Sequence, residues 1–311
     1  MTAFLLVLTN AIGGSTYPAA GVVLRGFSQK DALFLRLALA SVLFSPFVWR
    51  ARRRLSRLRE RDWALMLGVG VLGYALPLGL GLYGQSLSSA TSASLLIGVE
   101  PVSIVALSCL FLGERMTALK GAALAAGFCG AALIAFQGLS PIFGAPSGRL
   151  VGDLLLAAQG AFWSLYTVLG KPALERVEPM DMTAVTTLIA FAATAAWAAP
   201  GLSASAWRGA GLGPWAALVY LAAGGSFFGA WIWNAVLSRV EPSRSANYIF
   251  LQPLVGAALG AGLLGERITG WTAAGGVLVA AGMWAASRGE AASAGVGGQL
   301  APEREAPQQA A

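Results

Sequence analysis

The sequence predicts an all-α integral membrane protein with ten transmembrane helices in two inverted five-helix repeats. The first observation behind this prediction is composition: of 311 residues, 57% are hydrophobic and 11% are charged. Soluble domains carry about 25% charged residues, so this chain lacks the charged surface that water requires. The second observation is an internal repeat whose two copies each contain an odd number of apolar segments.

The apolar segments have the length of membrane spans. A helix needs about 20 mostly apolar residues to cross the hydrocarbon core. Ten segments qualify, at 2–24, 30–50, 62–83, 86–112, 117–137, 150–170, 180–200, 213–235, 243–264 and 268–287. The first lacks a basic n-region and a cleavage-like site, so we interpret it as a retained helix and not a signal peptide.

The basic residues predict the orientation of the chain. Seven arginines between Arg50 and Arg61 lie between the second and third spans. With that loop in the cytoplasm, fifteen Lys and Arg residues fall on the cytoplasmic side and five on the other. Because cytoplasmic loops are enriched in positive residues, we expect a multi-pass protein of the inner cell membrane with both termini in the cytoplasm. Binding of anionic lipid is the alternative role of the cluster, and nucleic acid is not an expected partner.

The repeat becomes visible when Pro101 is placed over Pro253. This offset of 152 residues also superimposes the Gly-Glu-Arg triplets at 113–115 and 265–267. The sequence therefore predicts four regions, which are a first five-helix repeat at 1–137, an outer linker at 138–149, a second repeat at 150–288 and a disordered cytoplasmic tail at 289–311. Since each repeat has five spans, the second enters the membrane in the opposite sense, as in many secondary transporters.

The two triplets end the fourth and ninth spans, where glycine breaks the helix and the charges reach the membrane interface. The charged members are Glu114, Arg115, Glu266 and Arg267. Two roles remain open for them: an end-cap that pairs with a neighbouring span, or a moving gate. Prolines within spans are expected bending points. These are Pro77, Pro101 and Pro253.

Two five-span units, each with a fourth-span proline followed by "LGER" and a glycine- and alanine-rich fifth span, resemble the EamA-type family of the drug/metabolite transporter superfamily. The resemblance covers about residues 2–287. Arg36 in "FLRLALA" is similar to the family's arginine there, and the second unit has none. The resemblance implies a ten-helix carrier without a covalent cofactor that moves small metabolites, often outward. Its amino-acid exporters are the branch that the chain resembles.

Glu100 is the sharpest candidate for transport, because it precedes a proline within a span, and charges at such depth usually face the bundle interior. The alternative is a protonated or hydrogen-bonded glutamate that ties two helices together. The "VEP" around Glu100 becomes "LQP" around Gln252, so the two units are not equivalent. Arg36 is a possible charge partner of Glu100 or of a substrate carboxylate; an interfacial position is the alternative.

Rings and amides within the spans predict a substrate cavity. The predicted lining is Tyr17, Tyr74, Tyr83, Glu100, Trp163, Tyr166, Trp231, Asn234 and Gln252. Such a cavity suits a flat, partly apolar solute, whereas core packing is the alternative for any single ring. We therefore expect a carrier or facilitator that exports amino acids, with a leaning to aromatic ones. Other small amphiphiles or drugs are the alternative substrates.

Other classes of protein lack support in the sequence. There is no histidine, so the usual acid–base dyads and zinc sites of an enzyme are missing. Cys109 and Cys129 have neither redox nor metal-ligand spacing. No phosphate-binding G-x-x-x-x-G-K-[ST] motif is present. We expect no cofactor and no metal. An intramembrane enzyme and a channel are the alternatives of a different class; the missing catalytic residues disfavour the enzyme, and the inverted duplication disfavours the channel.

Overall fold

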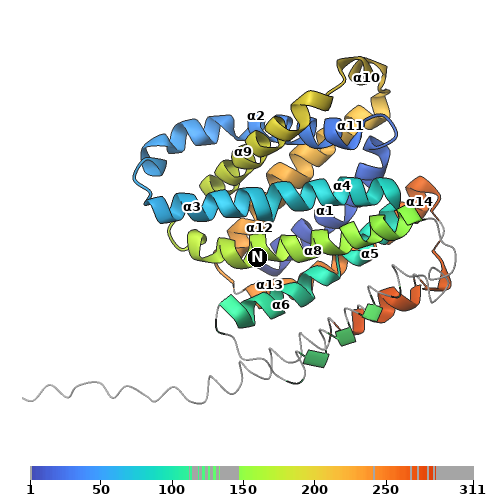
Figure 1. The fold of residues 1–311 in the computed structure, drawn as a ribbon. Helices are drawn as coiled ribbons and strands as arrows, with labels where there is room; N and C mark the ends of the chain where they lie inside the picture. The colour runs from blue at the N-terminus through green and yellow to red at the C-terminus, as the bar shows by residue number, and fades with distance from the viewer. Residues whose placement is uncertain are drawn as a thin grey trace, which may run out of the picture.

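The computed structural model describes residues 2–111, 147–240 and 242–266, with short stretches and single residues between 113 and 133 and between 268 and 284. The elements in these ranges are all helical, and the long helices run side by side as a bundle (Figure 1). Five stretches are long and apolar enough to cross a membrane, namely Gln29–Leu55, Glu60–Leu87, Ala90–Phe111, Pro179–Gly201 and Leu212–Leu237. The all-helical prediction is confirmed for the described residues.

The elements follow the predicted order of spans. In the first half they are α1 (Thr2–Val23), α2 (Gln29–Leu55), α3 (Glu60–Gly68), η1 (Val69–Ala75), α4 (Leu76–Leu87), α5 (Ala90–Leu96) and α6 (Val99–Phe111). In the second they are α8 (Ser147–Leu174), α9 (Pro179–Ala198), η3 (Ala199–Gly201), α10 (Ala204–Gly209), α11 (Leu212–Tyr220), η4 (Leu221–Gly229), α12 (Ala230–Leu237), α13 (Pro242–Ala246), η5 (Asn247–Phe250) and α14 (Leu251–Leu264). Some predicted features lie outside the described residues. The spans at 117–137 and 268–287 and the linker do so for the most part, and the tail does so wholly, as do Glu114, Arg115 and Arg267.

The fourth and ninth spans are broken, although the sequence predicts each as one continuous helix. The fourth divides into α5 and α6, and the ninth into α13, η5 and α14. Pro101 and Pro253 are each the third residue of the segment after the break, and Pro77 is the second residue of α4. A proline in the first helical turn costs no hydrogen bond, because the N–H groups there have no partner within the helix. Pro101 and Pro253 therefore stand in the first turn of a helical segment, whereas Pro77 lies within the continuous helical stretch Glu60–Leu87. The role of these prolines as bending points stays a prediction.

The third and eighth spans each contain a glycine-rich π-helical segment. These segments, η1 and η4, begin at Val69 and Leu221, which are 152 residues apart. Glycine also allows η1 to approach α8 closely, since a Cβ at Gly73 would lie 2.8 Å from the Cα of Tyr166. π-helical turns occur frequently at functional sites, and both segments line the cavity described below.

Ion pairs join the two halves of the chain at the end of the bundle that carries the α2–α3 turn (Figure 1). Arg54, next to that turn, contacts Glu178 at 2.6 Å and Asp181 at 3.0 Å. Arg176 contacts Asp62 at 3.1 Å. Asp62 and Asp181 are buried, and a buried carboxylate that loses its partner is costly. The pairs therefore connect the two halves at this end of the bundle. The α4–α5 turn, α10 and the end of α14 lie at the other end (Figure 1).

Candidate substrate cavity

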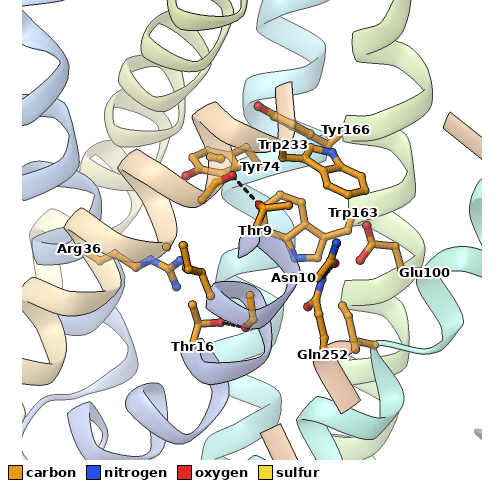
Figure 2. A pocket seen from close by; sticks show the side chains of 16 residues that line it. Thr9, Asn10, Thr16, Arg36, Tyr74, Glu100, Trp163, Tyr166, Trp233 and Gln252 are labelled. Atoms are coloured by element: carbon orange, nitrogen blue, oxygen red, sulfur yellow. Dashed lines mark hydrogen bonds between the residues drawn. The ribbon is translucent and has the colours of Figure 1, made fainter. Parts of the chain in front are cut away.

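A cavity of about 110 Å³ lies between elements of both halves of the chain. Its walls come from α1, α2, η1, α8, η4, α12 and α14 and from the region where α5 meets α6. Figure 2 shows its polar and aromatic side chains pointing toward a common space. Pockets for drug-sized ligands measure about 300–1,000 Å³. In this conformation the cavity therefore suits a small solute, and a larger one requires the helices to move apart.

Aromatic rings form one wall of the cavity. The ring of Tyr74 lies 5.5 Å from that of Trp163 and 5.6 Å from that of Tyr166, and the rings of Trp163 and Tyr166 are 5.7 Å apart. Rings at such distances stabilise one another beyond the burial of their surface. Trp233 of α12 joins the same wall (Figure 2). The wall therefore offers aromatic surface to a solute, and its rings are positioned by packing against one another.

Arg36 enters the cavity from α2. Its Nε donates a hydrogen bond to the Oγ of Ser226 at 2.8 Å, and its side chain is buried. A Cβ at Gly225 would lie 3.1 Å from Nη2 of Arg36, so the glycine leaves the space that the guanidinium occupies. Among the described residues, no ion pair links Arg36 to Glu100 or to another carboxylate.

Glu100 lies on the opposite side of the cavity from Arg36 (Figure 2). It is the second residue of α6, directly before Pro101, and only 7% of its surface is exposed. No donor or cation within the described ranges bonds to its carboxylate. The cavity thus contains two ionisable groups, a guanidinium and a carboxyl group, that are held apart.

Two smaller polar spaces continue from this cavity. One, of about 50 Å³, shares Thr16, Arg36 and Trp163 with the central cavity and is also lined by Gln85. The other, of about 280 Å³, shares Gln85 and reaches Glu266. Gln85 donates a hydrogen bond from Nε2 to the backbone oxygen of Tyr17 at 2.8 Å. The three spaces therefore follow one another toward the end of the bundle that carries the α4–α5 turn.

The second Gly-Glu-Arg triplet caps a helix of the other half. Gly265 has a φ of 69°, a left-handed conformation that glycine adopts at low cost, and it ends α14. Oε1 of Glu266 accepts from the backbone N–H of Ala90 at 2.8 Å, and Oε2 accepts from that of Thr91 at 2.6 Å. A carboxylate at a helix N-terminus satisfies free N–H groups and the helix dipole. Gly113, in the first triplet, has a φ of 73°.

The structure brings together some of the predicted cavity residues and not others. Tyr74, Glu100, Trp163, Tyr166 and Gln252 line the central cavity, as does Arg36. Tyr17 lines the smaller neighbouring space. The remaining three lie elsewhere in the bundle.

Tyr83 packs against Trp197 with the ring centres 5.9 Å apart. Asn234 is buried behind the wall, where its Nδ2 donates to the Tyr166 hydroxyl at 2.5 Å and to Oγ1 of Thr183 at 2.8 Å. Trp231 was predicted to line the central cavity but does not. Trp233 lines it instead. The prediction also missed the polar side chains of α1, which are Thr9, Asn10 and Thr16. Their signal in the sequence is polar residues within an apolar span.

The requirements of a metal site are not met in the described part of the chain. There, no group of three or more His, Cys, Asp or Glu side chains lies close enough to hold a metal ion. An apolar helical bundle with an internal cavity of convergent polar groups defines the class of membrane transporters for small solutes.

Within that class the chain belongs to the EamA-like transporter family, whose model matches residues 1–136 and 150–288. The resemblance to this family is thereby confirmed. An uncharacterized transporter of Archaeoglobus fulgidus is 29% identical over 290 residues, which cover 91% of this chain and 96% of the relative. A probable terminal-alkyne amino-acid exporter of Streptantibioticus cattleyicolor is 29% identical over 291 residues, with 91% and 92% covered.

A shorter match has a higher sequence identity. A probable amino-acid metabolite efflux pump of Salmonella typhimurium is 46% identical over 67 residues, or 22% of each chain. A solved crystal structure of a protein shares the fold with a TM-score of 0.64 at 18% identity, covering 92% of this chain and 95% of the other. The family and the names of these relatives indicate a multi-pass membrane transporter and not an enzyme.

Proposed function

We propose that the chain is a secondary carrier or facilitator that exports small metabolites, namely amino acids with a leaning to aromatic ones. The observation that carries the proposal is a cavity between both halves of the chain that combines an aromatic wall with a buried arginine and a buried glutamate. The names of two relatives, an amino-acid exporter and an amino-acid metabolite efflux pump, support the substrate class. The cavity volume of about 110 Å³ favours amino acids over drug-sized amphiphiles.

We further propose that transport proceeds by alternating access, with the two halves inverted relative to each other. The offset of 152 residues supports this mechanism, because it relates the starts of α3 and α11, η1 and η4, α5 and α13, and α6 and α14. In such carriers one repeat rocks against the other around a fixed central site. The broken spans and the π-helical segments lie at that site and supply places where the helices can adjust.

The positive-inside rule supports an assignment of the two ends of the bundle to the two sides of the membrane. With the basic α2–α3 turn in the cytoplasm, the ion-paired end of the bundle is cytoplasmic, and the chain of polar spaces leads to the outer face. The proposal therefore assigns this conformation to a state that is closed toward the cytoplasm. Both termini then lie in the cytoplasm.

Counterflow into proteoliposomes tests the proposed function. Vesicles that contain the purified protein and unlabelled phenylalanine are given labelled phenylalanine outside, with and without an imposed pH gradient. A carrier exchanges the two pools, so saturable accumulation of label is expected, and the arm with the gradient reports whether protons drive transport. If correctly folded protein exchanges none of the twenty amino acids, the proposed function is wrong.

Trp163 supplies the first mutational prediction. Trp163→Ala removes a ring from the cavity wall, so the initial exchange rate is expected to fall about tenfold, or roughly 1.4 kcal/mol, while Trp163→Phe keeps part of it. Trp49→Ala is the matched control, because Trp49 is 68% exposed and stacks only on Arg52. Elution as a monodisperse peak checks the fold of each variant. Undiminished exchange by Trp163→Ala would remove the aromatic wall from the proposal.

A further inference from the structure

The hydroxyl groups of the cavity direct their hydrogens away from it. Thr9 Oγ1 donates to the backbone oxygen of Gly229 at 2.9 Å, and Thr16 Oγ1 donates to that of Gly13 at 2.6 Å. A hydroxyl has one hydrogen and two lone pairs. Since each hydrogen is used within the protein, these oxygens can offer only lone pairs to a solute.

The amides near Glu100 are arranged in the same way. Asn10 donates from Nδ2 to the backbone oxygen of Leu6 at 2.8 Å, and its Oδ1 accepts from Nε2 of Gln252 at 2.8 Å. This fixes the orientation of both amides and leaves Oε1 of Gln252 as an open acceptor within the described structure, while each NH₂ group keeps a second N–H. The side-chain oxygens of Thr9, Thr16 and Gln252 therefore line the cavity as acceptors together with Glu100.

Glu100 is the strongest potential acceptor of this set, and no donor among the described residues bonds to its side chain. As a carboxylate it accepts hydrogen bonds at about four lone-pair positions, and a cation beside it offsets the cost of burying its charge. Arg36 does not compensate it, because the guanidinium is held by Ser226 on the other side of the cavity. A positively charged group with several N–H donors would satisfy the site.

The wall beside Glu100 also suits a cation. A Cβ at Gly160 of α8 would lie 3.2 Å from the backbone nitrogen of Glu100, so α6 and α8 meet there. Trp163 is three residues further along α8 and hence on the same face of the helix, and Figure 2 shows its ring and Glu100 in the same cavity. The face of a tryptophan ring attracts a cation when water is excluded.

We infer that Glu100 binds the ammonium group of the solute, and that aromatic primary amines are carried alongside the amino acids. This inference rests on the proposed function and deepens it. An ammonium group has three N–H donors, which match the carboxylate, Oε1 of Gln252 and the hydroxyl oxygens. The contact needs no carboxylate on the solute, so an amine with the same ring satisfies it equally.

Competition with two analogues of phenylalanine tests the inference in the wild-type carrier. Phenethylamine lacks the carboxylate, and 3-phenylpropionate lacks the amine. Phenethylamine is expected to inhibit exchange of labelled phenylalanine at a concentration similar to that of phenylalanine itself. Phenylpropionate is expected to be at least about tenfold weaker, as the loss of a charge-assisted hydrogen bond predicts. Labelled phenethylamine is expected to exchange as well.

Variants assign this preference to Glu100. Glu100→Gln keeps the size of the side chain and removes its charge, so the preference for the amine over the acid is expected to fall to about equal inhibition. Glu100→Asp keeps the charge and is expected to retain the preference. Asp153→Asn is the matched control, because Asp153 is a fully buried carboxylate of α8 that bonds to Ser88 and lies 3.7 Å from Arg149. Its preference for the amine is expected to equal that of the wild type.

The outcomes separate the two proposals. If Glu100→Gln exchanges too slowly for competition, direct binding of labelled phenethylamine to the detergent-solubilised variant replaces it and is expected to be lost. Exchange of phenylalanine that phenylpropionate inhibits and phenethylamine does not would overturn the inference and leave the proposed function standing. An unchanged preference in folded Glu100→Gln would also overturn it. Absence of exchange for every amino acid in the wild type would instead overturn the proposed function.

Discussion

At the scale of single residues, Arg36 keeps its place because residue 225 has no side chain. A Cβ at position 225 would lie 3.0 Å from Cγ2 of Thr16 and 3.1 Å from Nη2 of Arg36. Both distances are shorter than ordinary van der Waals contact, so either side chain would have to move. The hydrogen bond from Arg36 to Ser226, the next residue of η4, would then be strained.

Gly225→Ala is therefore expected to reduce exchange about tenfold, through overpacking that typically costs about 1–3 kcal/mol. Gly68→Ala is the control, because a Cβ there has open space within 4 Å and alanine favours a helix over glycine. Initial exchange rates at equal amounts of reconstituted protein give the comparison. Equal rates for the two variants would show that the position of Arg36 does not depend on this glycine.

The sequence predicts several cavity residues, and among those that it misses Trp233 has a physical reason. Glu100 and Gln252 stand before prolines within spans, and a polar residue at such depth must face the interior. Trp231 and Trp233, in contrast, cannot be told apart by helical periodicity, because η4 precedes both. A π-helical turn contains more residues than an α-helical turn, so it changes the phase of α12 and points Trp233 into the cavity.

At the scale of elements, Glu266 connects the end of α14 to the beginning of α5 across the two halves of the chain. The sequence predicts that glycine ends the helix there, and the φ of Gly265 agrees. The sequence does not predict that Glu266 accepts two hydrogen bonds, because the donors Ala90 and Thr91 lie more than 170 residues away along the chain. The contact is the one expected of an end-cap, and the choice between an end-cap and a moving gate stays a prediction.

Removal of this cap is expected to destabilise the protein. Glu266→Ala leaves the N–H groups of Ala90 and Thr91 without their acceptor, and loss of an N-terminal cap costs about 0.5–2 kcal/mol. The apparent melting temperature in detergent is expected to fall by about 2–4 °C. Glu175→Ala, at an exposed position after α8, is the control and is expected to melt like the wild type. The same melting temperature for both variants would contradict the capping role.

The breaks in the fourth and ninth spans mark the limit of prediction at this scale. Both spans are mostly apolar, so hydropathy alone predicts two continuous helices. The prolines at 101 and 253 indicate a disturbance, but a proline is compatible with either a bend or the start of a new helix. In the structure both prolines stand in the first turn of a segment, α6 and α14.

At the scale of the whole molecule, the two ends of the bundle differ. One end is tied by Arg54 with Asp181 and by Arg176 with Asp62. The other end contains the polar space of about 280 Å³ that reaches Glu266. The arginines of the sequence predict that this end is cytoplasmic, but they do not predict that Arg54 and Arg176 pair across the two halves.

Cysteine labelling tests the proposed orientation. In a variant whose Cys109 and Cys129 are replaced by alanine, Ser205→Cys is expected to react with a membrane-impermeant maleimide in intact cells. Ser56→Cys is expected to react only after the membrane is permeabilised, because it lies in the basic turn. Both serines are exposed, so access to the thiol does not limit the reaction. The reverse pattern would place the termini outside, and exchange activity of the cysteine-free parent is the control.

The contact between Tyr74 and Ser226 has an evolutionary consequence. The hydroxyl of Tyr74 donates to the backbone oxygen of Ser226 at 3.4 Å, and the offset of 152 residues makes these two positions equivalent. Copies related by a two-fold axis touch at equivalent positions only where the axis passes. On the proposed arrangement, a half-length ancestor would have assembled as a homodimer in which this residue met its own copy. On the same arrangement, gene fusion would have freed the two positions to differ, as the ring of Tyr74 and the small side chain of Ser226 do.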